Sequence, residues 1–376
     1  MSSDRHTLSQ RLDATRQRPS GFDYMRILLA LGVICWHTVI TSYGGNAQTR
    51  LENSFWWEPF GLILPMFFAL SGFLVAGSLE RCKTLFMFLG LRTIRILPAL
   101  AVETAISALL IGPLFTAGSE KAYFSAPDFH RYFLNILGDI HYHLPGVFTS
   151  NPNDAVNGQL WTVPYELTCY IVIAGLALAG AVKDRRKLLA ALAIFYLFEI
   201  ANTFIHPRHF NGLASGWSLV MMFLAGITLY RYRGTVLWNR KFLLVSLVFG
   251  LALIAIPNGD RFEALPLAYL TVYLGLLNPP RLRWLLSGDY SYGLFLYGFP
   301  IQQACVALGF ARGNWYLNLA AAIPVGFAVA VTSWWLIEKP ALKSRTLLKR
   351  IEAEYLARFV KAPEPPAPAV EAKEAA

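Results

Sequence analysis

Charged residues are scarce in this chain, at 15% of its composition, and 33 Lys and Arg outnumber 23 Asp and Glu. Two widespread signatures are missing as well. Without a GxxxxGK[ST] phosphate loop the sequence offers no support for ATP-driven transport, and without GxSxG it lacks the serine nucleophile of many hydrolases. Hydrophobic residues supply 55% of the chain. This composition is typical of an integral membrane protein.

Cysteine is also scarce, with 4 residues spread along the chain. They form neither a CxxC pair nor a Cys/His pattern, so no disulfide framework is expected. Two histidine pairs have no third ligand at a diagnostic spacing, namely His141 with His143 and His206 with His209. We therefore predict no metal site and no permanently bound cofactor.

Long apolar stretches recur along most of the chain, and a membrane-spanning helix needs about 20 such residues. The pattern predicts an all-α integral membrane protein with about ten transmembrane helices. The first stretch lacks a small-residue cleavage site and is expected to be retained as a span. The expected spans are 22–42, 58–79, 95–117, 158–182, 188–204, 214–230, 241–257, 263–279, 288–309 and 315–337.

Basic residues fall on alternate sides of these spans. They cluster before the first span, in every second loop and in the C-terminal tail, while the intervening loops carry few. An excess of Lys and Arg marks the cytoplasmic side, so both termini are expected in the cytoplasm. The net charge of +10 is therefore a topology signal. Nucleic acid is not an expected partner, whereas the lipid bilayer is.

The chain divides into three regions. Residues 1–20 are predicted to be a polar, mobile cytoplasmic N-terminus, residues 21–342 a single membrane domain, and residues 343–376 a cytoplasmic tail, disordered at its Pro- and Ala-rich end. No internal repeat is evident, which weakens an inverted-repeat transporter. The longest outer segment, 118–157, is expected to hold a short helix at 129–137 and an ordered, turn-rich loop.

Two polar side chains in the first span carry most of the functional signal. Arg26 lies near its start and His37 well inside it, where an ionisable group costs roughly 2.5–3.5 kcal/mol on insertion scales. About three helical turns separate them, so they share one face about 16 Å apart. His37 can act as a general base, or it can be a histidine hydrogen-bonded between helices. Arg26 can bind an anion, or simply anchor the span at the interface.

Arg92 and Arg95 lie three positions apart in LRTIRILPAL and therefore share a helix face. Two fixed guanidinium groups suit a phosphate clamp, because arginine offers forked donors and keeps its charge. Plain topology signalling is the alternative. In FFALSGFLV the small pair Ser71 and Gly72 predicts close helix packing rather than a nucleophile.

Glu166 in NGQLWTVPYELTCY is the strongest acidic candidate, and we expect it at a depth similar to that of His37. A carboxylate beside an imidazole can fix its tautomer and stabilise the imidazolium; otherwise Glu166 is satisfied by backbone or arginine donors. Trp161 belongs to an aromatic belt or stacks on a sugar. For Glu103 a buried hydrogen bond is expected, and Glu338, before Lys339 and Pro340, is expected to end the last helix.

These segments together resemble the acyltransferase-3 family of integral membrane acyltransferases. The resemblance covers about 21–340 and lies in six motifs in the expected order: GFDYMRILLALGVICWH, FFALSGFLV, LRTIRILPAL, VNGQLWTVPYELTCY, SYGLFLYGFPIQQ and SWWLIEKP. The loop LPGVFTSNPNDAVNGQLW looks most like that of members that decorate bacterial polysaccharides. One departure is Gly298, where many relatives have His, so no role of a second histidine carries over.

The resemblance implies an O-acyltransferase of the bacterial inner membrane. Its donor would be cytoplasmic acyl-CoA, most commonly acetyl-CoA, and its acceptor a hydroxyl of a sugar in an exopolysaccharide, O-antigen or lipid-linked glycan, with polysaccharide-assembly proteins as possible partners. His37 and Glu166 match the catalytic positions, and Arg26, Arg92 and Arg95 the donor site; Trp161 is a candidate acceptor contact. The alternative is a transporter or exporter of a glycan or lipid without acyl transfer.

Overall fold

The computed structural model describes residues 6–54, 58–205, 216–254, 259 and 262–359. Over these residues the chain is all-helical, which confirms the predicted class, and two isolated backbone bridges are its only extended pairings. The ends 1–5 and 360–376, including the predicted disordered end of the tail, lie outside the described residues.

Among the described residues, five helical segments are long and apolar enough to cross a membrane. These segments support a multi-pass membrane protein. They are α2 (Ser20–Tyr43), α4 with α5 (Pro59–Arg81), α6 with its continuation (Leu85–Phe115), η4 with α10 (Gly158–Leu178), and α16 with its continuation (Trp315–Arg358).

The other five predicted spans fall on helices that do not meet both criteria, so the count of ten stays a prediction. Residues 206–215 and 255–258, which overlap the ends of two of these predicted spans (214–230 and 241–257), lie outside the described residues. The helices are α11 (Arg185–Ile205), α12 (Gly216–Arg231), α13 (Arg240–Ile254), α14 (Ala264–Gly275) and α15 (Ser291–Ala307).

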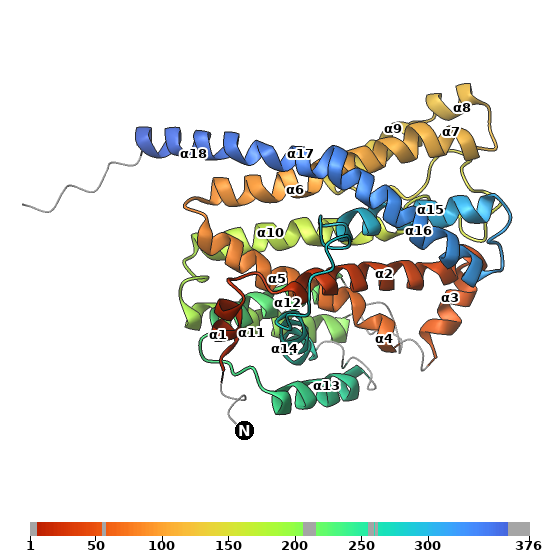
Figure 1. The fold of residues 1–376 in the computed structure, drawn as a ribbon. Helices are drawn as coiled ribbons and strands as arrows, with labels where there is room; N and C mark the ends of the chain where they lie inside the picture. Colours follow the sequence, from red (N-terminus) through yellow and green to blue (C-terminus); the bar gives the residue numbers. More distant parts are fainter. Residues whose placement is uncertain (1–5, 55–57, 206–215, 255–258, 260–261, 360–376) are drawn as a thin grey trace, which may run out of the picture.

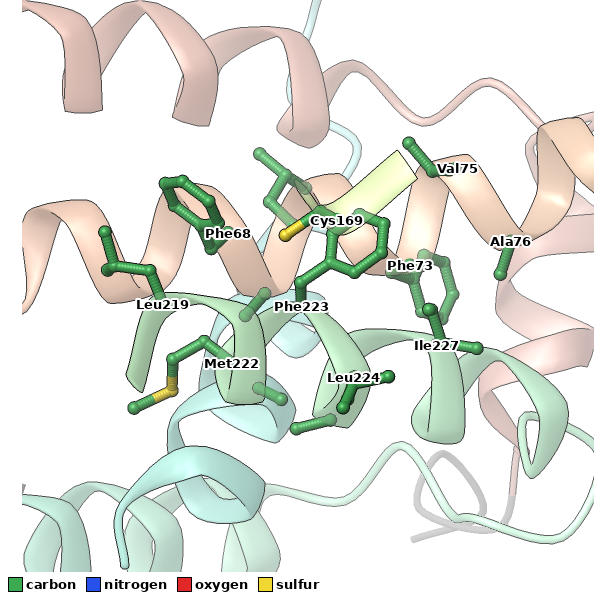
Figure 2. Close-up of a cluster of buried hydrophobic side chains, with 14 of the residues drawn as sticks. Phe68, Phe73, Val75, Ala76, Cys169, Leu219, Met222, Phe223, Leu224 and Ile227 are labelled. Carbon is green, nitrogen blue, oxygen red and sulfur yellow. The ribbon is translucent and has the colours of Figure 1, made fainter. Parts of the chain in front are cut away.

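The tightest packing of the core joins α5 (Ile63–Arg81) to α12, and Figure 2 shows their buried side chains meeting with Cys169 of α10 (Val163–Leu178). Two glycines make the approach possible. A Cβ on Gly72 would lie 2.0 Å from the carbonyl oxygen of Phe223, and a Cβ on Gly226 would lie 2.1 Å from that of Ala69. The close packing predicted for Gly72 is therefore confirmed.

Helix α2 runs through the middle of the molecule (Figure 1) and contacts α5, α14, α15 and α16 (Trp315–Ser333). Its start is fixed by Gly21, whose N–H donates to the carbonyl of Leu277 at 2.9 Å. The helix ends before Gly44, whose φ of 84° is a conformation that glycine adopts without strain. At Gly298 of α15, a Cβ would meet the Ile34 side chain of α2 at 2.7 Å, so glycine there brings α15 close to α2.

The N-terminal region differs from the expected mobile segment. Helix α1 (Leu8–Ala14) is closed by a capping box between Thr7 and Gln10 and buries Leu8 and Leu12 on one face. The guanidinium of Arg11 lies 4.0 Å from the ring centroid of Trp238. Two leucines at helical spacing and one cation–π contact therefore attach this short polar segment to the membrane domain.

Residues 116–157, which we term the cap, contain α8 (Glu120–Ser125), α9 (Pro127–Tyr132) and η3 (Phe133–Leu137) around a small apolar core. The helix predicted at 129–137 is confirmed across α9 and η3, and the following turn-rich segment is ordered. Burial raises the pKa of Tyr123 to about 12. Its hydroxyl therefore stays protonated and donates to the carbonyl of Ala108 at 2.6 Å, which ties the cap to the end of the third span.

The glycine contact between α5 and α12 generates a stability prediction. Gly72→Ala should destabilise the fold, because its methyl group would lie 2.0 Å from a backbone oxygen and the helices would have to separate; overpacking of this kind costs about 1–3 kcal/mol. Gly175→Ala in α10 is the matched control, because no atom lies within 4 Å of its Cβ. Thermal unfolding of the detergent-purified variants measures the difference, and equal melting temperatures would contradict the account.

Candidate functional site

A first cavity, which we term the arginine cavity, lies among α2, α5, α6 (Leu85–Ile106), α10 and α15 and has a volume of about 170 Å³. All three arginines predicted as a donor site line it, as does Glu166. The structure thus brings Arg26 of α2 together with Arg92 and Arg95 of α6, although about 70 residues of sequence separate them. Three permanent positive charges in a partly enclosed space make an anion site only if they are not all neutralised by the protein.

One carboxylate holds two of these arginines. Oδ2 of Asp289, in the loop before α15, accepts from Arg26 at 3.0 Å and from Arg95 at 2.5 Å. Arg95 also donates to Oε2 of Glu338 at 3.2 Å. Because Asp289 and Ser291 are themselves linked at 2.7 Å through Oδ1, this cluster connects α2, α6, α15 and the end of the last span.

Arg92 differs from the other two. Its side chain donates to the hydroxyl of Ser78 at 3.2 Å, its Nε makes no hydrogen bond, and within the described part of the chain no carboxylate lies at ion-pair distance from it. Arg92 is therefore the arginine of this cavity whose charge is least committed to the fold. It is the best-placed group for an incoming anion.

A second cavity of about 190 Å³, the histidine cavity, lies further along α2. His37 and Trp161 both line it, together with residues of α3 (Gly45–Glu52), of the cap and of η4 (Gly158–Thr162). The His37 ring meets the ring of Phe299 edge-on, with centroids 5.1 Å apart. Among the described residues no side chain makes a hydrogen bond or ion pair with the imidazole, so both ring nitrogens are free for a substrate.

The two cavities are neighbours. Leu64, Thr162 and Phe295 line both of them, and we term these three residues the neck. Because α2 rises about 1.5 Å per residue, the two sites are about 16 Å apart at Arg26 and His37. A long, thin molecule held by its anionic end among the arginines could therefore present its other end to His37.

Glu166 lies differently from the expectation that it supports His37. Its carboxylate accepts from the hydroxyl of Tyr170, one turn later in α10, at 2.7 Å, and it lines the arginine cavity. Glu166 is not among the residues that line the histidine cavity. Glu166 is therefore a neighbour of Arg92 and Arg95 and not of His37.

Several residues of the site are missing from the sequence-based set. The sequence analysis singles out neither Asp289 nor Gln159. For Asp289 a usable signal exists, because an acidic residue beside an apolar run is unusual in a chain poor in acids. Glu338 does not end the last helix. A π-helical turn at Trp334–Glu338 continues into α17 (Lys339–Ala341), and Glu338 is buried against Arg95. Glu103 does have the buried hydrogen bonds expected of it.

Metal ligands do not gather in this part of the molecule. Over the described residues, no group of three or more His, Cys, Asp or Glu side chains is arranged to hold an ion. The two cavities instead offer cationic groups at one end and an imidazole at the other, and the three residues of the neck line both. This combination suits a group-transfer enzyme embedded in a membrane.

Comparison with known proteins agrees with this class. A family model described as an acyltransferase domain matches residues 20–339, most of the chain, which therefore belongs to the acyltransferase-3 family and is an acyltransferase. An O-acetyl transferase of Shigella phage Sf6 is 27% identical over 335 residues, covering 85% of this chain and 94% of the relative. Nodulation protein 10 of Rhizobium leguminosarum bv. viciae is 28% identical over 368 residues, covering 88% and 95%. No solved structure matches the chain.

The different partners of the arginines predict different effects on stability. Arg95→Ala leaves two carboxylates without their shared cation, and breaking a largely buried pair costs up to about 3–5 kcal/mol. Arg92→Ala removes one hydrogen bond to Ser78 and should cost about 1 kcal/mol. Thermal unfolding of both variants measures this order. A melting temperature for Arg95→Ala at or above that of Arg92→Ala would show that the ion cluster does not support the fold.

Proposed function

We propose that this acyltransferase moves an acyl group, most often acetyl, from cytoplasmic acyl-CoA to a sugar hydroxyl in an exopolysaccharide, O-antigen or lipid-linked glycan. The observation that carries the proposal is the pair of adjoining cavities, one lined by arginines and one by an unpartnered histidine. The relative named O-acetyl transferase supports the choice of acetyl and of an oxygen acceptor.

On the donor side, the phosphates of acyl-CoA bind in the arginine cavity. Arg92, which forms no ion pair among the described residues, binds a phosphate directly. Arg26 and Arg95 stay paired with Asp289, where they add positive electrostatic potential and orient the phosphates. The pantetheine arm extends through the neck along α2. Its extended length is comparable with the separation of about 16 Å between Arg26 and His37, so the thioester arrives in the histidine cavity.

At the thioester, the neutral imidazole of His37 removes the proton of an acceptor hydroxyl, and the hydroxyl oxygen attacks the carbonyl carbon. The tetrahedral intermediate collapses, the carbon–sulfur bond breaks, and the imidazolium returns its proton to the leaving CoA thiolate. The acyl group ends as an ester on the acceptor. A variant in which His37 first carries the acyl group uses the same residues. Trp161 offers a face on which a sugar ring can stack.

The proposed orientation gives each cavity a side of the bacterial inner membrane. The distribution of Lys and Arg supports ten spans with both termini in the cytoplasm. Arg26, near the start of α2, then faces the compartment that contains acyl-CoA, and His37 faces the outer half of the membrane, where glycans are modified. Acyl-CoA is a substrate in this proposal, and the proposed steps use no resident cofactor.

The central test of this function is acceptor-dependent release of CoA. The purified protein in lipid nanodiscs, given acetyl-CoA and methyl glycosides of glucose, galactose and mannose, should release CoA and form acetyl esters. His37→Ala should lower this rate about 10²–10⁴-fold, because it removes the general base. His130→Ala, an exposed cap histidine, is the matched control. Near-normal transfer by His37→Ala would contradict the mechanism, and glycan movement without CoA release would favour the transport alternative.

Donor affinity tests the arginine cavity separately, with no acceptor present. Arg92→Ala should weaken acetyl-CoA binding about 10–100-fold, because a hydrogen bond between charged groups contributes about 1.5–3 kcal/mol. Arg81→Ala, an exposed charge at the end of α5, should leave the affinity unchanged. Calorimetric titration measures both. Unchanged affinity in Arg92→Ala would remove this residue from the donor site.

A further inference from the structure

A buried glutamine of α15 holds the last part of the cap by hydrogen bonds at both ends of its amide. Nε2 of Gln303 donates to the backbone carbonyls of Asn153 at 2.8 Å and of Ala155 at 2.6 Å. Its Oε1 accepts from the amide nitrogen of Asn151 at 3.1 Å. Because a backbone carbonyl can only accept, these contacts fix which way the amide points. We term residues 151–155 the cap loop.

The cap loop is also fixed by contacts that do not involve this amide. A Cβ on Gly44, at the end of α2, would lie 2.8 Å from the carbonyl oxygen of Pro152, so glycine there lets the loop approach the backbone of α2. Within the loop, the N–H of Ala155 donates to Oδ1 of Asn153 at 2.9 Å. The loop is therefore held between the ends of two helices.

The cap loop forms part of the wall of the histidine cavity. Asn153 and Ala155 line this cavity, as does His37. Gln303 lines neither cavity, but Phe299, one turn earlier on α15, lines the histidine cavity and meets the ring of His37. Among the residues of the cap, all of which the structure describes, none lines the arginine cavity. A change in the cap loop should therefore affect the histidine cavity selectively.

The burial of Gln303 makes its amide hard to replace by water. The residue is 0% exposed, so water can take over its hydrogen bonds to the loop only if the loop separates from α15. Without the amide, the cap loop loses three hydrogen bonds to this side chain and is expected to move toward solvent. The wall of the histidine cavity would then be mobile.

We propose that Gln303 is a positioning residue for the acyl acceptor, because it holds the cap loop as a fixed wall of the histidine cavity. This inference rests on the proposed function, in which the donor reaches His37 through the neck and the acceptor occupies the rest of the cavity. A fixed wall lowers the cost of binding, since the loop need not be ordered each time an acceptor binds. Loss of the Gln303 amide weakens acceptor binding and leaves donor binding unchanged.

Gln303→Met tests the proposal, because methionine has a similar length but no amide. Hydrogen–deuterium exchange needs no substrate, and backbone amides in 149–157 should exchange faster than in the wild type. With saturating acetyl-CoA, the KM for the fastest-acetylated of methyl glucoside, methyl galactoside and methyl mannoside should rise about tenfold. The dissociation constant for acetyl-CoA should not change. A variant that was only less stable would lose active enzyme and so lower the apparent kcat, without raising the KM.

Asn135→Leu is the matched control. Asn135 is also a fully buried amide that holds a segment of the cap: its Nδ2 donates to the carbonyl of His141 at 3.0 Å, and its Oδ1 accepts from the N–H of His141 at 2.7 Å. It lines neither cavity. This variant should leave the exchange of 149–157 and the glycoside KM as in the wild type.

Asn151→Ala approaches the same contact from the loop side. It removes the donor to Oε1 of Gln303 and leaves α15 unchanged, so it keeps the test available if Gln303→Met does not fold. Both the exchange of 149–157 and the glycoside KM should shift in the same direction as in Gln303→Met.

Two results would overturn the proposal: unchanged exchange of the cap loop in these variants, or faster exchange with an unchanged glycoside KM. A wild type that acetylates none of the glycosides would contradict the proposed function, and the acceptor role of Gln303 would fall with it. The exchange measurement, which needs no substrate, separates that failure from a cap loop that Gln303 does not hold.

Discussion

The two ion pairs of Asp289 are the interaction on which the site depends. Arginine side chains from α2 and α6 would repel one another in a partly enclosed space, and one oxygen of Asp289 accepts from both. Glu338 adds a second anion beside Arg95. A paired cluster is tolerated where isolated charges would not be. It also sets the distance between the first span, which carries the histidine, and the third span, which carries Arg92.

This cluster explains a division of roles among similar residues. Two of the three arginines are occupied by carboxylates, so they shape the arginine cavity, while Arg92 retains its charge for a ligand. The histidine cavity has a different character, because it is lined by the imidazole of His37, by aromatic rings and by aliphatic side chains. Keeping the charged site and the reactive site apart, with the neck between them, allows one substrate to be bound by its anionic end and react at the other.

Much of this arrangement is readable from the sequence, because costly residues in apolar runs have few structural explanations. Helical spacing alone predicts that Arg26 and His37 share a helix, and the acyltransferase class follows from motif order. The placement of Glu166 in the arginine cavity, apart from His37, is not predictable in this way, because it depends on how α10 packs against α6 and α12. Asp289 and Glu338 depend on contacts about 190 to 260 residues away in sequence, and no local periodicity reports such pairings.

The central claim is that one bound molecule joins the two cavities, and a cryo-EM structure of the protein with CoA tests it most directly. The account predicts the phosphates within hydrogen-bond distance of Arg92 and the pantetheine thiol at the neck formed by Leu64, Thr162 and Phe295, directed toward His37. A nucleotide bound outside the arginine cavity, or a thiol directed away from His37, would contradict it.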